Sequence, residues 1–420
     1  MVRHLLPEFN AWLDELPEHR REQLLYYHRR HLVWAGLLLF LFHLRSRLQF
    51  NLERGCETLA ANLTRLSGTG EAAIAHGDTL AAWFRKLPAG CLLELVQRCV
   101  RRLIRGKFLD DFRLEGRFLV AVDATGVLTF SQRHCPHCLT RRLADGGTQF
   151  YHPVLEAKLV AANGLALSIG TIFIENPEGW TPDTKQDCEK KAFYRLAEQL
   201  HNAFPRMKFC FLFDALYLDG GVIACCARHE WSFMITFKEG SMPAVWAEAQ
   251  RLLNLQPGNQ VSARLPDGTG RSYRWAQQVD AGGLNALFCH ETDPSGAQTT
   301  FAWLTDLAIR RDNAIALSDH GGRLRWKIEN EGFNTQKNGG FALEHAYCHD
   351  GNAARVFYGL LQLAHLMQQL MTLGNLLQPF NKRFVTVRNF VRRLCESLRH
   401  CLLPPPDELE PVGQFRWDSS

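Results

Sequence analysis

Apolar residues recur at three- and four-residue spacing through the first 110 residues, most clearly over 24–48 and 92–103. This spacing places apolar side chains on one face of a helix, so a helical N-terminal domain is predicted over 1–110. An uninterrupted apolar run lies at 32–42. Eleven helical residues rise only about 16 Å, about half of the hydrocarbon core of a bilayer. We therefore expect a buried helix there and no membrane partner.

From residue 117 the pattern changes to short runs rich in Val, Ile, Leu and Phe, which are typical of strands. Helical patterns lie between the later runs, and this order favours a mixed five-stranded sheet flanked by helices, an α/β fold. The predicted strands are 118–124, 149–162, 165–174, 207–213 and 231–238.

Strand-like runs and turn residues return later in the chain and predict a β-rich insertion over 241–310. The α/β domain would then comprise 111–240 and 311–350. Residues 351–420 are predicted to form a helical C-terminal region that ends in a loose tail.

Composition narrows the classes of protein that this chain can belong to. With 46% hydrophobic and 22% charged residues it is an ordinary globular chain, which excludes collagen-like, low-complexity and wholly disordered proteins. The balance of 48 Lys+Arg against 43 Asp+Glu leaves +5, so overall charge does not by itself indicate a polyanionic partner. Thirteen cysteines and a first ten residues without an apolar stretch predict reduced thiols and a cytoplasmic protein.

The last helix predicted in the N-terminal domain is rich in arginine. Arg98, Arg101, Arg102 and Arg105 are spaced so that several of them share one stripe. Such a stripe suits a phosphate backbone, which makes DNA binding one reading of the N-terminal domain. A solvated helix face is the equally weighted alternative.

Two aspartates follow strand-like runs. Asp123 comes after FLVAV and Asp214 after FCFLF. An ionised carboxylate is costly to bury unpaired, so each either caps a turn or holds a cation at the edge of the sheet. Because the first and fourth strands would be neighbours, we expect both side chains at one edge, where divalent metals find converging oxygen ligands.

The run GGRLRWKIENEGFNTQK supplies a third acid. Arg325, Glu329 and Lys337 are separated by multiples of four residues, which on a helix gives one gently drifting stripe with the carboxylate between two cations. Trp326 and Ile328 are then predicted on the buried side. Taken alone, such a stripe is usually an exposed face with salt bridges.

Together these elements resemble the bacterial insertion-sequence transposases of the DDE class, whose catalytic domain has the ribonuclease H-like fold. The resemblance spans residues 115–350 and comprises VDATG around Asp123, LFDALY around Asp214, WLTDL from Trp303, and RWKIENEGFNTQK, in the family's order. It implies a ribonuclease H-like sheet with a β-rich insertion before the third acid. It also implies a DNA transposase that cuts transposon ends and joins them to target DNA.

By this resemblance, Asp123, Asp214 and Glu329 are the catalytic triad and the ligands of two Mg²⁺ ions, for which Mn²⁺ can substitute. The two ions support in-line displacement at phosphorus. Double-stranded DNA, both transposon ends and target, is the implied partner, and a homodimer is implied because two ends are brought together. Such a protein is expected in the cytoplasm, associated with the nucleoid.

The resemblance also implies contacts to DNA. Arg325 matches an arginine that contacts the transposon end, and Trp303 falls where some relatives place a tryptophan that stacks on a flipped base. Arg323 and Lys337 are expected to hold backbone phosphates.

The chain departs from the family signature Y-x2-R-x3-E-x6-K. Gly322 occupies the tyrosine position, and Lys337 lies one residue beyond the expected lysine. The shift leaves Glu331 as an alternative to Glu329. We prefer Glu329 because RWxIE is intact and because Glu331 would point about 200° away around the helix.

A second constellation is HCPHC, in which Cys135 and Cys138 have the C-x2-C spacing that lets two thiolates hold one zinc ion. Zinc binding and a pair of reduced, unliganded cysteines in a hairpin are both open. Helix packing is expected for the clusters KQDCE at 185–189 and EHAYCH at 344–349. Further zinc ligands would have to come from His134, His137, His152 or Cys188.

Two other functions remain open. A ribonuclease H-like nuclease or resolvase is the enzymatic alternative, and the insertion before the third acid and the arginine of RWxIE speak against it. A DNA-binding descendant with a decayed catalytic site is the non-enzymatic alternative, and the presence of all three acids speaks against that.

Overall fold

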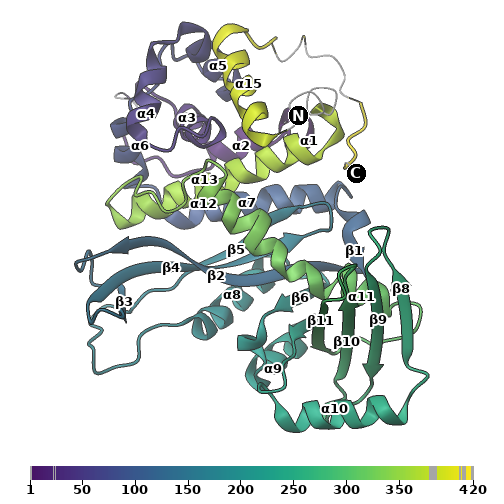
Figure 1. The fold of residues 1–420 in the computed structure, drawn as a ribbon. Coiled ribbons are helices and arrows are strands. Elements are labelled where there is room, and N and C mark those ends of the chain that lie inside the picture. Colours follow the sequence, from purple (N-terminus) through teal and green to yellow (C-terminus); the bar gives the residue numbers. More distant parts are fainter. Residues whose placement is uncertain are drawn as a thin grey trace.

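The computed structural model describes residues 2–21, 23, 25–377, 386–405, 408 and 413–417. Helices from both ends of the chain form a layer over one part of a long twisted sheet, and further helices lie on the other side of that sheet (Figure 1). Part of the expected C-terminal tail (406–407, 409–412 and 418–420) lies outside the described residues.

The N-terminal region is helical, as predicted. Its helices are α1 Val2–Leu5, α2 Phe9–Asp14, α3 Arg29–Leu41, α4 Arg47–Leu52, η2 Glu53–Gly55, α5 Glu57–Ser67, α6 Gly77–Phe84 and α7 Ala89–Arg105. Helix α3 contains most of the apolar run at 32–42, and every residue from His31 to Leu41 is buried. Among the described residues, no helix is long and apolar enough to cross a membrane.

The C-terminal helices pack directly on the N-terminal ones. They are α13 Gly351–Leu373, η7 Asn375–Leu377 and α15 Val387–His400. Helix α13 contacts α3 and α7, and α15 contacts α5. A Cβ added at Gly36 of α3 would collide with the side chain of Leu360 of α13, so the glycine permits this close approach. The two ends of the chain therefore share one hydrophobic core.

The described strands form one mixed sheet. Its order is β3-β4-β2-β6-β7-β11-β10-β9-β8; β5 pairs with β4 beyond β3, and β1 pairs with β2. Strands β2, β6 and β7 are mutually parallel, and the other pairs are antiparallel. The strands are β1 Arg113–Leu114, β2 Arg117–Phe130, β3 Leu139–Arg142, β4 Thr148–Val160, β5 Ala166–Phe173, β6 Phe209–Phe213, β7 Ser232–Thr236, β8 Gln260–Arg264, β9 Gly270–Ala276, β10 Asn285–Thr292 and β11 Gln298–Thr305.

The mixed α/β architecture is confirmed. The strands predicted from periodicity appear as β2, β4, β5, β6 and β7, in the spatial order β5-β4-β2-β6-β7. The β-rich insertion extends the same sheet, because β11 pairs antiparallel with β7 and places Trp303 opposite Thr236. The sheet is thus larger than the five strands expected.

Helices that precede, connect or follow the strands cover the sheet. They are η3 Asp110–Phe112, α8 Glu189–Ala203, η4 Ala215–Tyr217, α9 Gly220–Arg228, α10 Pro243–Leu255, α11 Ala314–Asp319, η5 Gly322–Trp326, η6 Ile328–Asn334 and α12 Thr335–Asn338. Figure 1 shows α10 at the lower edge of the extended sheet and α8 on the side of β2 away from the terminal helices.

Candidate active site

The two aspartates lie at the carboxyl end of the parallel pair formed by β2 and β6. That pairing runs as far as Ala121 opposite Leu212. Asp214 directly follows β6, and its Oδ1 accepts a hydrogen bond from the backbone N–H of Leu216 at 2.9 Å. Asp123 lies within β2, so the prediction that it ends a strand was wrong: β2 continues along β4 after β6 has ended. Both aspartates still lie just beyond the last parallel contact.

The third acid lies in a segment of mixed helical geometry, where one regular helix was expected. A 3-10 turn, η5, is followed by the π-helix η6, which contains Glu329, and then by α12. A π-helix bonds residue i to i+5, so it contains more residues per turn than an α-helix and is frequent at functional sites. Lys337, which lies one residue beyond the position that the sequence resemblance predicts, follows this π-helical turn in α12.

Arg325 connects the first and third acids. The Arg325 residue is 7% exposed, and its Nη2 donates to Glu329 Oε1 at 2.7 Å. Its Nη1 lies 3.8 Å from Asp123 Oδ2. Glu331 instead pairs with Lys327, with 2.5 Å between Nζ and Oε1. These contacts favour Glu329 over Glu331 as the acid of the site.

A fourth carboxyl group belongs to the same cluster. Glu189 is the first residue of α8, and its Oε1 accepts a hydrogen bond from the Tyr217 hydroxyl at 2.7 Å. Burial raises the pKa of Glu189, and the negative charge of Asp214 raises it further. The sequence predicts only helix packing for KQDCE, which contains Glu189. It contains no local signal for the interaction of Glu189 with Asp214, because this interaction depends on how α8 packs against the sheet.

The raised pKa values of Asp123 and Glu189 indicate that negative charge accumulates at the site. Burial raises the pKa of Asp123 to about 7, the charge of Glu329 adds to the rise, and Arg325 opposes it. Arg325 also opposes the rise at Glu189. Three of the four carboxyl groups, those of Asp123, Glu189 and Glu329, therefore share the Arg325 guanidinium as their counter-ion, and a divalent cation would correct this charge balance.

The donor set suits magnesium, which prefers carboxylate oxygens. The carboxylates do not, however, converge as closely as ligands of one ion. Within the described ranges, Cys135, Cys138 and His152 form the group of potential metal ligands whose ligand atoms all lie within 4.8 Å of one another. The four carboxylates do not meet this criterion. Unscreened carboxylates repel one another, which accounts for wider spacing in a cluster without a cation.

A cleft of about 880 Å³ opens over the site. Asp214 and Glu329 both line it, together with Arg323 and Arg325. Its wall includes Thr236 at the end of β7 and residues 300–303 of β11. Asp214 and Glu329 are thus accessible to a large substrate from this side.

Two tryptophans line this cleft and differ in exposure. Trp303 is 4% exposed, and its indole packs so closely on Gly322 that a Cβ there would collide with it. Trp326 is 52% exposed, with the Arg325 guanidinium 4.4 Å from its ring centroid. The prediction that Trp326 faces the core was wrong because the segment is not a regular α-helix, whereas Ile328 is buried as expected.

The remaining cations predicted to hold phosphates are placed differently. Arg323 lines the cleft, pairs with Glu291 at 3.1 Å and lies 4.3 Å from the Phe301 ring centroid. Lys337 pairs with Glu344 at 2.7 Å and is not among the residues that line the cleft. The structure therefore brings Arg323 and Arg325 to the acids and leaves Lys337 outside.

A buried polar network fixes the segment that contains Glu329. Gln336 of α12 donates to Gln362 of α13 at 2.8 Å, and its Nε2 lies 3.0 Å from His365 Nδ1. Lys158 of β4 donates to the same Gln362 at 2.8 Å. All of these side chains are buried, so the helical segment is tied to both α13 and the sheet.

The arginine stripe of α7 is partly neutralised. Arg98 pairs with Glu15 at 2.7 Å, and Arg102 pairs with Glu8 at 3.3 Å. Arg101 donates to the backbone carbonyl of Ala203 at 3.0 Å. These contacts attach α7 to neighbouring elements, so the stripe is only in part a free cationic face.

The two predicted zinc ligands lie away from the acids. Cys135 and Cys138 lie between β2 and β3, with 3.6 Å between their sulfurs, and His152 of β4 is within 3.4 Å of both.

Neither a scan against protein-family models nor a search of curated proteins finds a match to this chain.

Proposed function

We propose that the protein is a Mg²⁺-dependent DNA transposase of the DDE class, which cuts the ends of its element and joins them to target DNA. The observation that carries the proposal is the gathering of Asp123, Asp214 and Glu329 around the end of the β2–β6 pair, with Arg325 between the first and the third. These acids come from segments up to 206 residues apart in the chain. A ribonuclease H-like fold is part of the proposal and is supported by the order β5-β4-β2-β6-β7.

Magnesium, when bound, would polarise the scissile phosphodiester and lower the pKa of an attacking water. Asp214 and Glu329 offer carboxylate oxygens on the cleft wall, and Asp123 offers one behind Arg325. Asp123 holds a proton up to about pH 7 in the absence of added positive charge, so cation binding and loss of that proton are linked.

Arg325 has two tasks in this arrangement. It now neutralises Glu329 and lies beside Asp123. Once a cation compensates these acids, its planar guanidinium is available to hold a non-bridging phosphate oxygen in two-point contact. This makes Arg325 the residue that aligns the DNA backbone with the carboxylates.

Trp326 is the aromatic side chain with an open face in the cleft. Its exposure suits stacking on an unpaired base next to the cut, an interaction worth about 1 to 3 kcal/mol. Double-stranded DNA as partner, a homodimer that joins two ends, and association with the nucleoid belong to the same proposal.

The test uses the full chain and linear DNA that contains its gene with flanking sequence, incubated with Mg²⁺ and a target plasmid. We expect breaks at both ends of the element and products in which those ends are joined to the plasmid. Asp214→Asn should form neither product. Cleavage without joining would identify a nuclease or resolvase, and binding without cleavage a decayed descendant; either result would contradict the proposal.

A further inference from the structure

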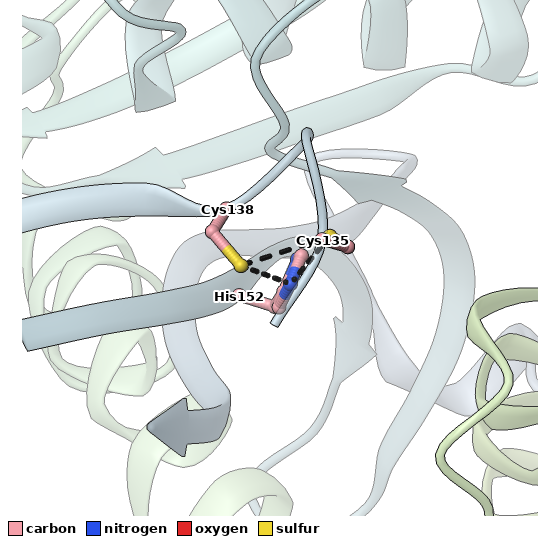
Figure 2. A group of neighbouring side chains, drawn as sticks. All are labelled: Cys135, Cys138 and His152. Atoms are coloured by element: carbon pink, nitrogen blue, oxygen red, sulfur yellow. Dashed lines mark hydrogen bonds between the residues drawn. The ribbon is translucent and has the colours of Figure 1, made fainter. Parts of the chain in front are cut away.

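The cysteine and histidine cluster lies at the end of β2 and β4 away from the acids. Cys135 and Cys138 come from the loop after β2, and His152 comes from β4, so a long-range strand contact brings them together. The sulfurs are 3.6 Å apart, and His152 Nε2 lies 3.4 Å from Cys135 Sγ and 3.2 Å from Cys138 Sγ. Figure 2 shows the imidazole edge directed between the two sulfurs.

These distances are close to those of three ligands around one tetrahedral zinc ion. Bond lengths of about 2.3 Å to sulfur and about 2.0 Å to nitrogen place two sulfurs about 3.8 Å apart, and a sulfur and a nitrogen about 3.5 Å apart. The three separations here are shorter than these values by a few tenths of an ångström at most. Thiolate and imidazole are also the donors that zinc prefers over magnesium.

A carboxylate lies near the ring nitrogen of His152 that faces away from the sulfurs. His152 Nδ1 lies 3.8 Å from Glu175 Oε1, and Glu175 is in turn paired with Arg355 at 2.5 Å. A carboxylate behind the second ring nitrogen is the usual partner of a metal-bound histidine, because it fixes the tautomer and the ring orientation. Nε2 is then left to face the sulfurs.

The cysteine loop is held from outside as well. The buried Asn176 side chain donates to the Cys138 carbonyl at 2.8 Å, and its backbone N–H donates to the His137 carbonyl at 3.1 Å. Its Oδ1 accepts from the backbone N–H of Asp187 at 3.1 Å. Asn176 thus links the loop to the segment that ends at Glu189, the first residue of α8.

We propose that Cys135, Cys138 and His152 bind one Zn²⁺ ion, with water as the fourth ligand. No fourth His, Cys, Asp or Glu among the described residues joins this group. His137 Nδ1 lies 2.9 Å from the Asn176 carbonyl, and the His134 ring stacks on Phe130 with 4.4 Å between centroids. The ion closes the loop after β2 onto β4. Through Asn176 it stabilises the segment that leads to Glu189.

The test measures metal in the purified full chain. After dialysis against metal-free buffer we expect about one zinc per chain by elemental mass spectrometry. The double variant Cys135→Ser/Cys138→Ser and the variant His152→Ala should each contain almost none. Cys188→Ser is the matched control, because Cys188 is an exposed thiol adjoining α8, and it should keep its zinc.

A second measurement does not depend on the variants being folded. Wild-type chain stripped of zinc should take up Co²⁺ and develop the thiolate-to-cobalt absorption of a tetrahedral site, which added Zn²⁺ should abolish. Wild-type protein that binds neither metal, a double variant that keeps its zinc, or an intact mass showing a Cys135–Cys138 disulfide would each overturn the site. Loss of zinc in His137→Ala would overturn the assignment of the fourth position to water.

Discussion

Two ligand clusters lie along the β2–β4 pair, one toward each end, and they differ in how closely their ligand atoms approach one another. His152 pairs with Leu128, five residues beyond Asp123 on β2, which separates the clusters by about 17 Å along the strand. At one end the thiols and the imidazole lie within 3.6 Å of one another. At the other end Arg325 lies between carboxylates that stay apart.

Charge explains this difference. Burial raises the pKa of the Cys135 thiol, so this group is neutral before metal binds, and neutral groups approach one another at little electrostatic cost. Ionised carboxylates repel one another, so the acid cluster needs a positive charge between its members or a retained proton, which burial favours at Asp123. Proximity of ligands in the absence of an ion is therefore a good guide to a zinc site and a poor guide to a magnesium site.

Loss of an acid should have the largest effect on activity. Asp123→Asn, Asp214→Asn and Glu329→Gln should each slow Mg²⁺-dependent DNA cleavage by at least about 10³-fold, because each removes several kcal/mol of transition-state stabilisation. End binding, measured by gel shift, should persist. Glu331→Gln is the matched control and should stay active. A dead Glu331→Gln enzyme beside an active Glu329→Gln enzyme would transfer the role to Glu331.

Glu189 tests whether the carboxylate cluster extends beyond the triad. Glu189→Gln should reduce cleavage about 10- to 100-fold, as expected for a group that orients the ligands of a metal. Higher Mg²⁺ concentration should recover part of the loss. The measurement is the cleavage rate across a magnesium titration, with the exposed Glu178→Gln as control. Equal rates for the two variants would restrict Glu189 to packing.

Variants of the two tryptophans test whether base stacking depends on the exposed Trp326 or on Trp303, the residue that the resemblance indicates. Trp326→Ala should weaken binding of DNA with an unpaired end base by about 1 to 3 kcal/mol, since it removes the exposed stacking face. Trp303→Phe keeps a buried aromatic ring, although a smaller one, and should leave that binding unchanged. Fluorescence of a reporter base at the cut end measures both. A loss confined to Trp303→Phe would favour the original assignment of base stacking to Trp303.

The last prediction concerns the folding stability of the chain, and not catalysis or DNA binding, as a function of pH. The pKa of Asp123 rises from 3.8 to about 7, so the folded chain keeps this proton over a range in which the unfolded chain has lost it. Stability therefore falls as pH rises from about 4 to about 7 and is level above that range. In magnesium-free buffer, Asp123→Asn should gain about 2 kcal/mol more over wild type at pH 8 than at pH 5.

Urea unfolding at the two pH values measures this difference. The exposed Asp145→Asn variant is the control and should show no such change. If the difference in the free energy of unfolding between Asp123→Asn and wild type is the same at both pH values, Asp123 is ionised without a cation. The proposal that Asp123 retains a proton until a cation binds would then fail.

Local pattern was enough to predict the strands and two of the acids, because apolar runs and their ends are encoded in adjacent residues. It placed Asp123 at a strand end because the apolar run stops there, although β2 continues for seven more residues along β4. Trp326 was predicted on the wrong side because the sequence pattern does not distinguish a 3-10 turn and a π-helix from a regular α-helix. Glu189 lies near the carboxylates and His152 near the cysteines because of tertiary contacts, which the local spacing of residues does not predict.

The shared core of the two chain ends has a consequence for synthesis. The buried face of α3 is completed by α13, which leaves the ribosome more than 300 residues later. Until then the nascent chain exposes one of its most apolar helices, a state that invites aggregation and chaperone binding. A polypeptide truncated before Gly351 would keep this defect permanently, so premature termination should yield insoluble fragments and no partly active enzyme.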